Sequence, residues 1–255
     1  MRERVLQDLG FAGNIVGATV LRVVEQGKHG VKKAEVKRER EAYGLLRTVP
    51  PHAALLFPDI VLPDMGETRS ALYMTMPLCD GGNITKHKFD GFEEVLDLFQ
   101  ALTGGVQHLH DHEIVHFDIK GENVLVRKQS VVAGRALHSV SFVLSDFGVA
   151  EHCTEGKYAG LFNGTDGEVA PEMQRLFNGG RAEIDGFKCD VYGIGRSVDR
   201  CMKDLQRQST VDASEQRLIE KWVKLSMHAS PDHRPSAGEI FKQLVSCEGS
   251  NGYTR

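Results

Sequence analysis

Two short strings hold the residues best suited to chemistry. They are 116–123 (HFDIKGEN) and 145–148 (SDFG). The first places a carboxylate, an ammonium and an amide oxygen within eight residues, and the second adds another carboxylate two residues before a glycine. Moving a phosphoryl group from ATP to a hydroxyl needs a carboxylate beside the attacking oxygen, a cation on the moving phosphate and oxygen ligands for magnesium. The spacing therefore predicts a phosphoryl-transfer site.

In this order, with the apolar strand 124–126 directly after the first string, the two strings resemble those of eukaryotic Ser/Thr protein kinases. The resemblance implies that Asp118 is the catalytic base and that Lys120 contacts the γ-phosphate of ATP. It also implies that Asn123 and Asp146 bind Mg²⁺. The lysine two residues after the base favours the Ser/Thr subclass over tyrosine kinases.

Further resemblances lie downstream. Residues 164–172 (GTDGEVAPE) resemble the end of an activation segment, in which Thr165 is expected to hydrogen-bond the catalytic Asp and Lys. Glu172 is expected to form a buried ion pair with Arg234, which lies in a late RPS-like string. Asp190 matches the helix Asp that anchors the backbone of the catalytic loop.

Residues 72–83 (LYMTMPLCDGGN) resemble the strand and hinge that hold adenine through backbone groups. An interlobe linker that binds no nucleotide would account for the same residues. If ATP binds here, the expected contacts are Met76 as gatekeeper, Leu78, Cys79, Asn83 and, after the catalytic loop, Leu125.

The phosphate-binding part of the small lobe departs from the family pattern. Gly10, Gly13 and Gly17 lie where the glycine-rich loop belongs, but their spacing is not GxGxxG. Gly17 is expected nearest the phosphates, and an ordinary β-turn is the alternative.

The lysine that contacts the phosphates is ambiguous because no VAIK string is present, and Lys32 and Lys33 are both candidates. Its expected partner is Glu41, because Leu45 one turn later would face Phe147, with Glu39 as the second choice.

A third departure is Phe117, where most kinases have an arginine directly before the catalytic Asp. That arginine normally receives the activation-loop phosphate. Without it, a phosphate on Thr154, Tyr158 or Thr165 has no guanidinium at this position to bind. We therefore expect activity that does not depend on activation-loop phosphorylation.

The elements that must position these residues follow from periodicity. Short strands are expected over 15–24 and 71–76, with one helix over 37–49 that Pro50 and Pro51 stop. Helices are expected over 92–110, 191–202, 214–227 and 237–245, and residues 127–140 are expected to form a hairpin insertion. Strands followed by helices predict an α+β fold, and the resemblance makes it bilobal. One domain over 1–246 is expected, with its small lobe over about 1–77, hinge 77–82 and large lobe 83–246, followed by a polar tail over 247–255.

The length, net charge and cysteine content of the chain limit the classes of partner to be expected. The chain has 255 residues, a net charge of −4, and five widely spaced cysteines without a CxxC pair. These values give no reason to expect nucleic-acid or membrane partners, a zinc site or disulfides. No apolar run has the length of a signal peptide or membrane span. We expect a monomer in the cytoplasm or nucleus that acts on a protein substrate.

Three functions fit the sequence to different degrees. The first is an active Ser/Thr protein kinase that uses ATP and Mg²⁺. The second is a pseudokinase that acts as a scaffold or binds nucleotide without turnover. Only the departures of the small lobe from the family pattern favour it. The third, a small-molecule kinase, is disfavoured by the Ala170-Pro171-Glu172 string and the late Arg234.

Overall fold

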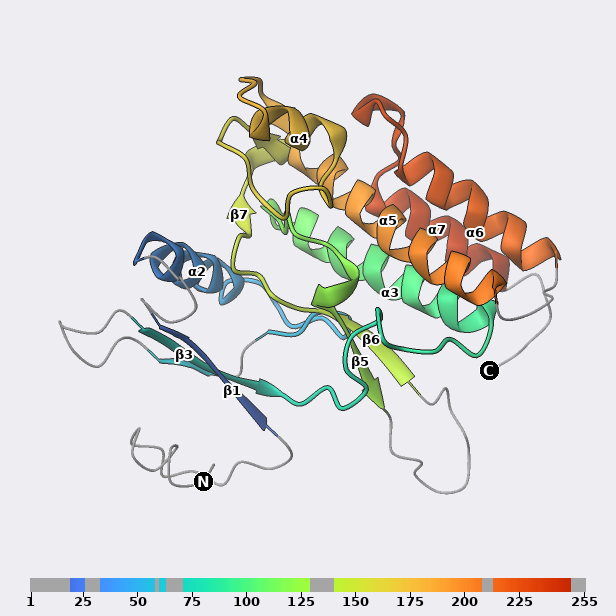
Figure 1. The fold of residues 1–255 in the computed structure, drawn as a ribbon, viewed down its shortest axis with the longest axis horizontal. Helices are drawn as coiled ribbons and strands as arrows, with labels where there is room; N and C mark the ends of the chain where they lie inside the picture. Colours follow the sequence, from blue (N-terminus) through green and yellow to red (C-terminus); the bar gives the residue numbers. More distant parts are fainter. Residues whose placement is uncertain are drawn as a thin grey trace.

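The computed structural model describes residues 19–25, 33–57, 60–62, 71–128, 140–207 and 213–248. The smaller lobe contains an antiparallel sheet in the order β1-β3-β2, formed by Thr19–Glu25, Ala71–Pro77 and Ile60–Leu62. Helix α2 (Lys33–Leu46) lies beside this sheet (Figure 1). The strands are rich in β-branched and aromatic residues, which favour extended backbone.

Helix α2 begins four residues earlier than the sequence predicted and ends before Pro50. Ala42, Tyr43 and Leu46 share one face of the helix and are buried in the core. Pro50 and Pro51 cannot continue a helix, because proline lacks the amide hydrogen and clashes with the preceding turn. The helix therefore stops before the two prolines, but its last residue is Leu46 and not the predicted residue 49, and its first residue also differs from the prediction.

The larger lobe is helical, with α3 (Phe92–His110), α5 (Gly186–Gln206), α6 (Ala213–Ser226) and α7 (Ala237–Glu248) packed together (Figure 1). Helix α3 matches its predicted bounds, with acidic residues in its first turn and histidines in its last, as the helix dipole favours. Its two glycines allow close packing: a Cβ on Gly105 would lie 3.1 Å from Leu55, and one on Gly104 would lie 3.2 Å from Phe241 of α7.

Within the described residues, three further strand pairs lie outside the β1-β3-β2 sheet. Strands β5 (Val124–Lys128) and β6 (Val140–Leu144) are antiparallel and flank the predicted hairpin insertion, whose residues 129–139 lie outside the described part. Shorter pairs are β4 (Ile114–Val115) with β7 (Glu151–His152) and β8 (Lys157–Tyr158) with β9 (Ile184–Asp185). Helix α4 (Pro171–Phe177) follows the activation segment.

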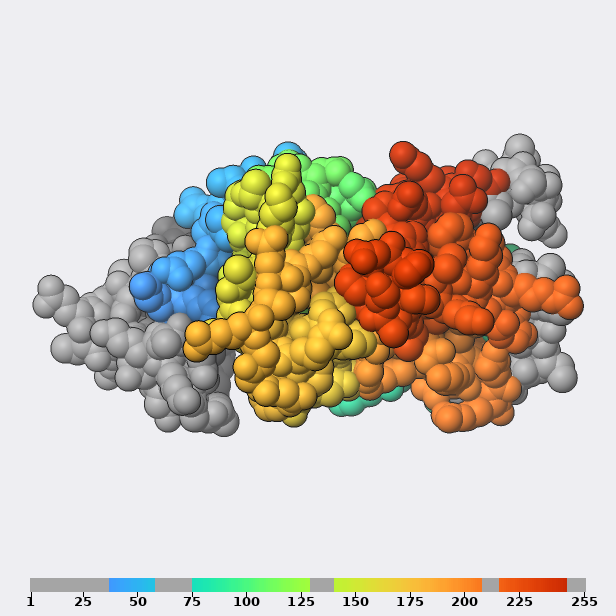
Figure 2. Space-filling model, turned by 90° about the horizontal axis from the view of Figure 1, so that it is seen from above, coloured from blue at the N-terminus to red at the C-terminus, as the bar shows by residue number. Residues whose placement is uncertain are grey.

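Strands on one side and helices on the other confirm the bilobal α+β architecture. One large core cluster extends from α2 to α7, and a smaller one lies between the catalytic loop and the activation segment. Figure 2 shows α2 in blue beside the yellow segment that contains β7. Helix α7 includes residues 246–248, so the predicted polar tail began too early for 247 and 248. None of the helices within the described ranges is long and apolar enough to cross a bilayer.

Candidate active site

Asp118 lies at the centre of a closed hydrogen-bonding network. Lys120 Nζ donates to Asp118 Oδ2 at 2.8 Å, and Thr165 Oγ1 donates to Asp118 Oδ1 at 2.6 Å. Lys120 Nζ also lies 2.6 Å from Thr165 Oγ1, which completes a triangle. The geometry joins the catalytic loop to the activation segment through the three residues that the sequence predicted to meet.

Asn123 holds the same carboxylate from the other end of the loop. Its Nδ2 donates to the Asp118 backbone oxygen at 2.8 Å and to Asp118 Oδ2 at 3.0 Å. Burial alone would raise the pKa of Asp118, but the hydrogen bonds from Lys120 and Thr165 and the Lys120 charge hold it below its ordinary value. These contacts therefore favour the ionised form of Asp118.

The Asp190 side chain of α5 anchors the backbone of the catalytic loop. Its carboxylate accepts the backbone N–H groups of His116 at 2.9 Å and Phe117 at 2.8 Å, and His110 lies 3.0 Å from Oδ2. Phe117 has a left-handed φ of 62°, a costly conformation for a non-glycine residue that these bonds stabilise. The anchoring role expected for Asp190 therefore matches the observed contacts.

The two predicted metal ligands are held in register by Ser145. This residue precedes Asp146, and both its backbone nitrogen and its Oγ donate to the Asn123 carbonyl oxygen at 2.8 Å. Asn123 uses its amide nitrogen on Asp118, which leaves its Oδ1 as the end suited to a cation. An amide oxygen and a carboxylate are hard donors, so this pair fits Mg²⁺.

The helix glutamate beside this site is Glu39, and the preference for Glu41 was wrong. Glu39 is only 7% exposed, and a Cβ on Gly148 would lie 3.3 Å from its carboxyl carbon and 3.4 Å from Asp146 Oδ1. Glu41 points to the outer face, where its side chain is 65% exposed and pairs with Lys37 at 3.6 Å. Positions two apart on a helix lie about 200° apart around the axis, so only one of the two can face the site.

The phosphate-binding residues of the small lobe are only partly described. Lys33 is the first residue of α2 and does not lie in a strand, which contradicts its assignment as the strand lysine. Lys32 and Gly17 lie outside the described residues.

The hinge candidates follow β3 in sequence. Met76 packs against the main core cluster, Leu78 is 37% exposed, and Cys79 is half-buried. A β-bridge pairs Asn83 with Leu125 and brings the end of the hinge against β5. Leu125 is half-buried, whereas its neighbours Val124 and Val126 on the opposite face are fully buried.

A buried ion pair ties the activation segment to the large lobe. Arg234 donates to Glu172 Oε1 at 2.6 Å and Oε2 at 2.9 Å, and its guanidinium lies 5.0 Å from the Tyr192 ring centre. Both side chains are at most 2% exposed. The expected pairing is therefore present, in the bidentate geometry that arginine favours.

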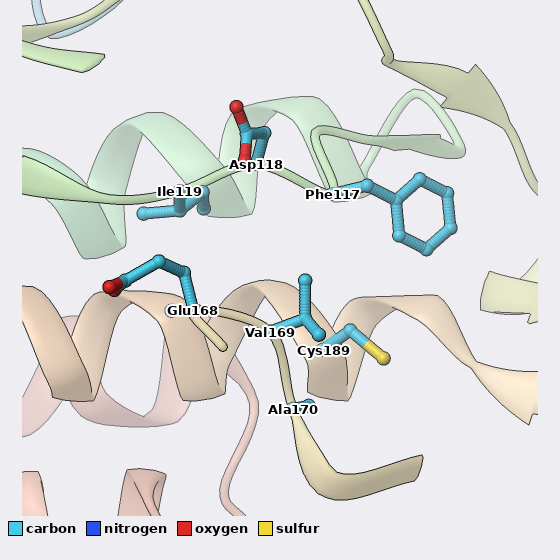
Figure 3. A pocket seen from close by; sticks show the side chains of 8 residues that line it. Phe117, Asp118, Ile119, Glu168, Val169, Ala170 and Cys189 are labelled. Carbon is cyan, nitrogen blue, oxygen red and sulfur yellow. The ribbon is translucent and has the colours of Figure 1, made fainter. Parts of the chain in front are cut away.

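Phe117 replaces the usual arginine with an aromatic contact. Its ring centre lies 4.6 Å from that of Tyr158, and both residues are buried in the smaller core cluster. In Figure 3 the Phe117 ring points away from Glu168, and the Asp118 side chain points away from Val169 and Ala170. A small pocket lies between the catalytic loop, the activation segment and α5, lined by Phe117, Asp118, Ile119, Glu168, Val169, Ala170, Cys189 and Gly193.

Several residues near the site were not predicted. Glu168 pairs with Arg196 at 3.2 Å and Arg200 at 2.7 Å, whose four-residue spacing on α5 was the available signal. Asn163 and Arg38 connect the activation segment to α2, with Arg38 NH1 donating to Asn163 Oδ1 at 3.4 Å. They are 125 residues apart, so no local pattern could have revealed this contact.

Comparison with known proteins agrees with this geometry. The mouse sperm motility kinase 3A is 27% identical over 248 residues, which cover 88% of this chain and 46% of the relative. Mouse serine/threonine-protein kinase Nek1 is 31% identical over 202 residues (74% of this chain, 16% of the relative). Human death-associated protein kinase 2 is 28% identical over 173 residues (66% and 41%). The chain thus spans less than half the length of these relatives. Residues 10–247 match the family described as "Protein kinase domain". The chain belongs to the protein kinase domain family, with Ser/Thr kinases among its relatives.

Proposed function

We propose that the chain is an active Ser/Thr protein kinase that transfers the γ-phosphate of ATP to Ser and Thr hydroxyls of proteins. The closed triangle of Asp118, Lys120 and Thr165 carries this proposal. It brings an ionised carboxylate and an ammonium together at one partly exposed site. A chain that kept the fold without the reaction would have no need to maintain these charges at hydrogen-bonding distance.

Each residue has a defined task in this reaction. Asp118 orients the acceptor hydroxyl and accepts its proton as the O–P bond forms, because its pKa is held low enough to keep it ionised. Lys120 lies on the flank of that carboxylate and neutralises charge on the phosphoryl group as it moves. Thr165 fixes both partners. Bound Mg²⁺ neutralises the phosphates, and Asn123 and Asp146 are the residues that would hold it.

The proposed nucleotide site lies between hinge and β5. The bridge from Asn83 to Leu125 brings ribose-side and adenine-side candidates together. Met76, Leu78 and Cys79 complete the adenine contacts, and Gly17 and Lys32 are proposed to contact the phosphates.

Glu39 is proposed to pair with Lys32. We expect Glu39→Gln to lower kcat/KM about 10- to 100-fold, because a lysine without its partner is misplaced relative to the phosphates. Glu41→Gln is the matched control: it makes the same chemical change two residues away on the exposed face, and should leave the rate unchanged. Equal effects of the two substitutions would contradict the assignment.

Activity is further proposed to need no activation-loop phosphate. The support is the Phe117–Tyr158 contact, which fills with packed rings the place where family members keep the phosphate-binding arginine. Protein treated with phosphatase should transfer phosphate as fast as untreated protein. A large rise in rate on phosphorylation of Thr154, Tyr158 or Thr165 would refute this.

The function is tested by incubating the chain with γ-³²P-labelled ATP, Mg²⁺ and generic protein substrates. Label on serine and threonine of the substrate, absent when Mg²⁺ is chelated, is the expected result. Binding of Mg-ATP without transfer would favour the alternative, a pseudokinase scaffold. Label on small hydroxyl compounds alone would place the chain among small-molecule kinases.

A further inference from the structure

Asn163 connects the activation segment to two other parts of the molecule. It is 2% exposed and lies two residues before Thr165. Its Nδ2 donates to the Val149 carbonyl oxygen at 2.9 Å and to Glu151 Oε1 at 3.2 Å. Its Oδ1 accepts from Arg38 NH1 at 3.4 Å and from the Gly164 backbone nitrogen at 3.2 Å. One side-chain amide therefore joins α2, the segment after the SDFG string and the backbone that leads to Thr165.

The residues that Asn163 contacts lie next to residues of the candidate active site. Arg38 is adjacent to Glu39, whose carboxyl group lies against Gly148. On the other side, Gly164 is held against the catalytic loop so closely that a Cβ there would lie 2.5 Å from the Phe117 carbonyl oxygen. The same amide thus contacts α2 through Arg38 and the backbone that leads to Thr165 through Gly164.

The charges around the amide are balanced without a phosphate. Burial raises the pKa of Glu151, and the positive charge of Arg38 opposes that rise. The neutral Asn163 lies between the two and donates to the carboxylate while it accepts from the guanidinium. A side-chain amide can do both at once, because its nitrogen donates and its oxygen accepts.

From these contacts we infer that Asn163 is a positioning residue for catalysis, which couples α2 to the activation segment and holds Thr165 on Asp118 without any phosphate group. The inference rests on the proposed kinase function. It assigns to one buried amide the ordering role that an arginine and a phosphate share in relatives with the usual loop.

Asn163→Asp tests this with no change in size. Aspartate loses the donor to Val149 and places a carboxylate against Glu151, so the segment should loosen. An unsatisfied buried partner corresponds to about a 10- to 100-fold shift in a local equilibrium. We expect kcat to fall by that factor while KM for ATP is unchanged. Adding Glu151→Gln supplies an amide donor to the new carboxylate and removes the repulsion, so it should restore part of the lost kcat. A fall in kcat at unchanged KM, in protein that unfolds at the same urea concentration as the parent, separates a positioning role from a purely structural lesion.

Two readouts separate this inference from the kinase proposal. Tryptic cleavage after the exposed Lys157 reports on the activation segment whether or not the chain is an enzyme, and Asn163→Asp should accelerate it by a similar factor. Asn178→Asp, the same change at an exposed position after α4, is the control and should alter neither rate. Unchanged cleavage and unchanged kcat in Asn163→Asp would overturn the inference. Faster cleavage in a chain that transfers no phosphate would support the coupling and refute the kinase function.

Discussion

Replacing Arg234 by methionine is expected to lower the stability of the large lobe substantially. The guanidinium donates to both oxygens of Glu172 and also to the carbonyl oxygens of Lys188 at 2.9 Å and His228 at 2.8 Å. Methionine fills similar space but leaves the buried Glu172 carboxylate and two carbonyl groups without this donor. Breaking a buried pair from one side costs about 3 to 5 kcal/mol of unfolding free energy. For a chain of this size that corresponds to a fall in Tm of about 6 to 20 °C.

Urea unfolding followed by fluorescence measures this loss, because Trp222, the single tryptophan of the sequence, lies on α6 in the large lobe. Arg207→Met is the matched control. Its exposed guanidinium pairs with Asp204 at 2.8 Å, and such a pair contributes at most about 1 kcal/mol. Adding Glu172→Gln to Arg234→Met removes the stranded charge and should recover about 1 to 3 kcal/mol. If Arg234→Met and Arg207→Met cost the same, the buried pair does not stabilise the lobe as described.

Three further outcomes are expected. Gly164→Ala should cost more unfolding free energy than Gly167→Ala in urea titrations: both have φ above +70°, but only the Gly164 Cβ meets backbone, so equal losses would contradict the close approach. Gly44→Ala should add about 0.5 to 1 kcal/mol, because this exposed position in α2 has no atom within 4 Å of the new Cβ, and a loss would mean a missed contact. Burial, with the charges of Glu151 and Cys153, raises the pKa of Tyr158 to about 12. The buried neutral Tyr158 therefore stabilises the fold fully below pH 10, and this stabilisation is lost as the pH rises toward 12. The difference in tyrosinate absorbance between the parent and Tyr158→Phe reports the titration of this residue and should have its midpoint near pH 12. A midpoint near pH 10 would refute the raised pKa.

The parts that the sequence predicted well depend on local signals. Helix α3 has apolar residues at helical spacing along its whole length, and the catalytic-loop residues lie within eight positions, so their proximity follows from chain geometry. The pairing of Glu172 with Arg234 could be predicted only through family resemblance, because 62 residues separate them.

The predictions failed where the outcome depends on which face of a helix is buried or on a contact between distant parts of the chain. The choice between Glu39 and Glu41 depends on which face of α2 meets the core, and that face is set by Ala42, Tyr43 and Leu46 packing against the rest of the protein. Asn163 had no signal at all. An asparagine in a loop is typical of turns, and apart from the adjacent Gly164 its side-chain partners come from parts of the chain 12 to 125 residues away.

The proposed base of phosphoryl transfer is Asp118, which Lys120, Thr165 and Asn123 hold in place. The most direct measurement compares the parent chain with Asp118→Asn for two quantities, the rate of ³²P transfer to protein and the Kd for Mg-ATP. Asparagine keeps the shape but cannot accept the proton, so the rate should fall about 100-fold or more while the Kd stays within about twofold. Equal transfer rates in the two proteins would contradict the assignment of Asp118 as the base.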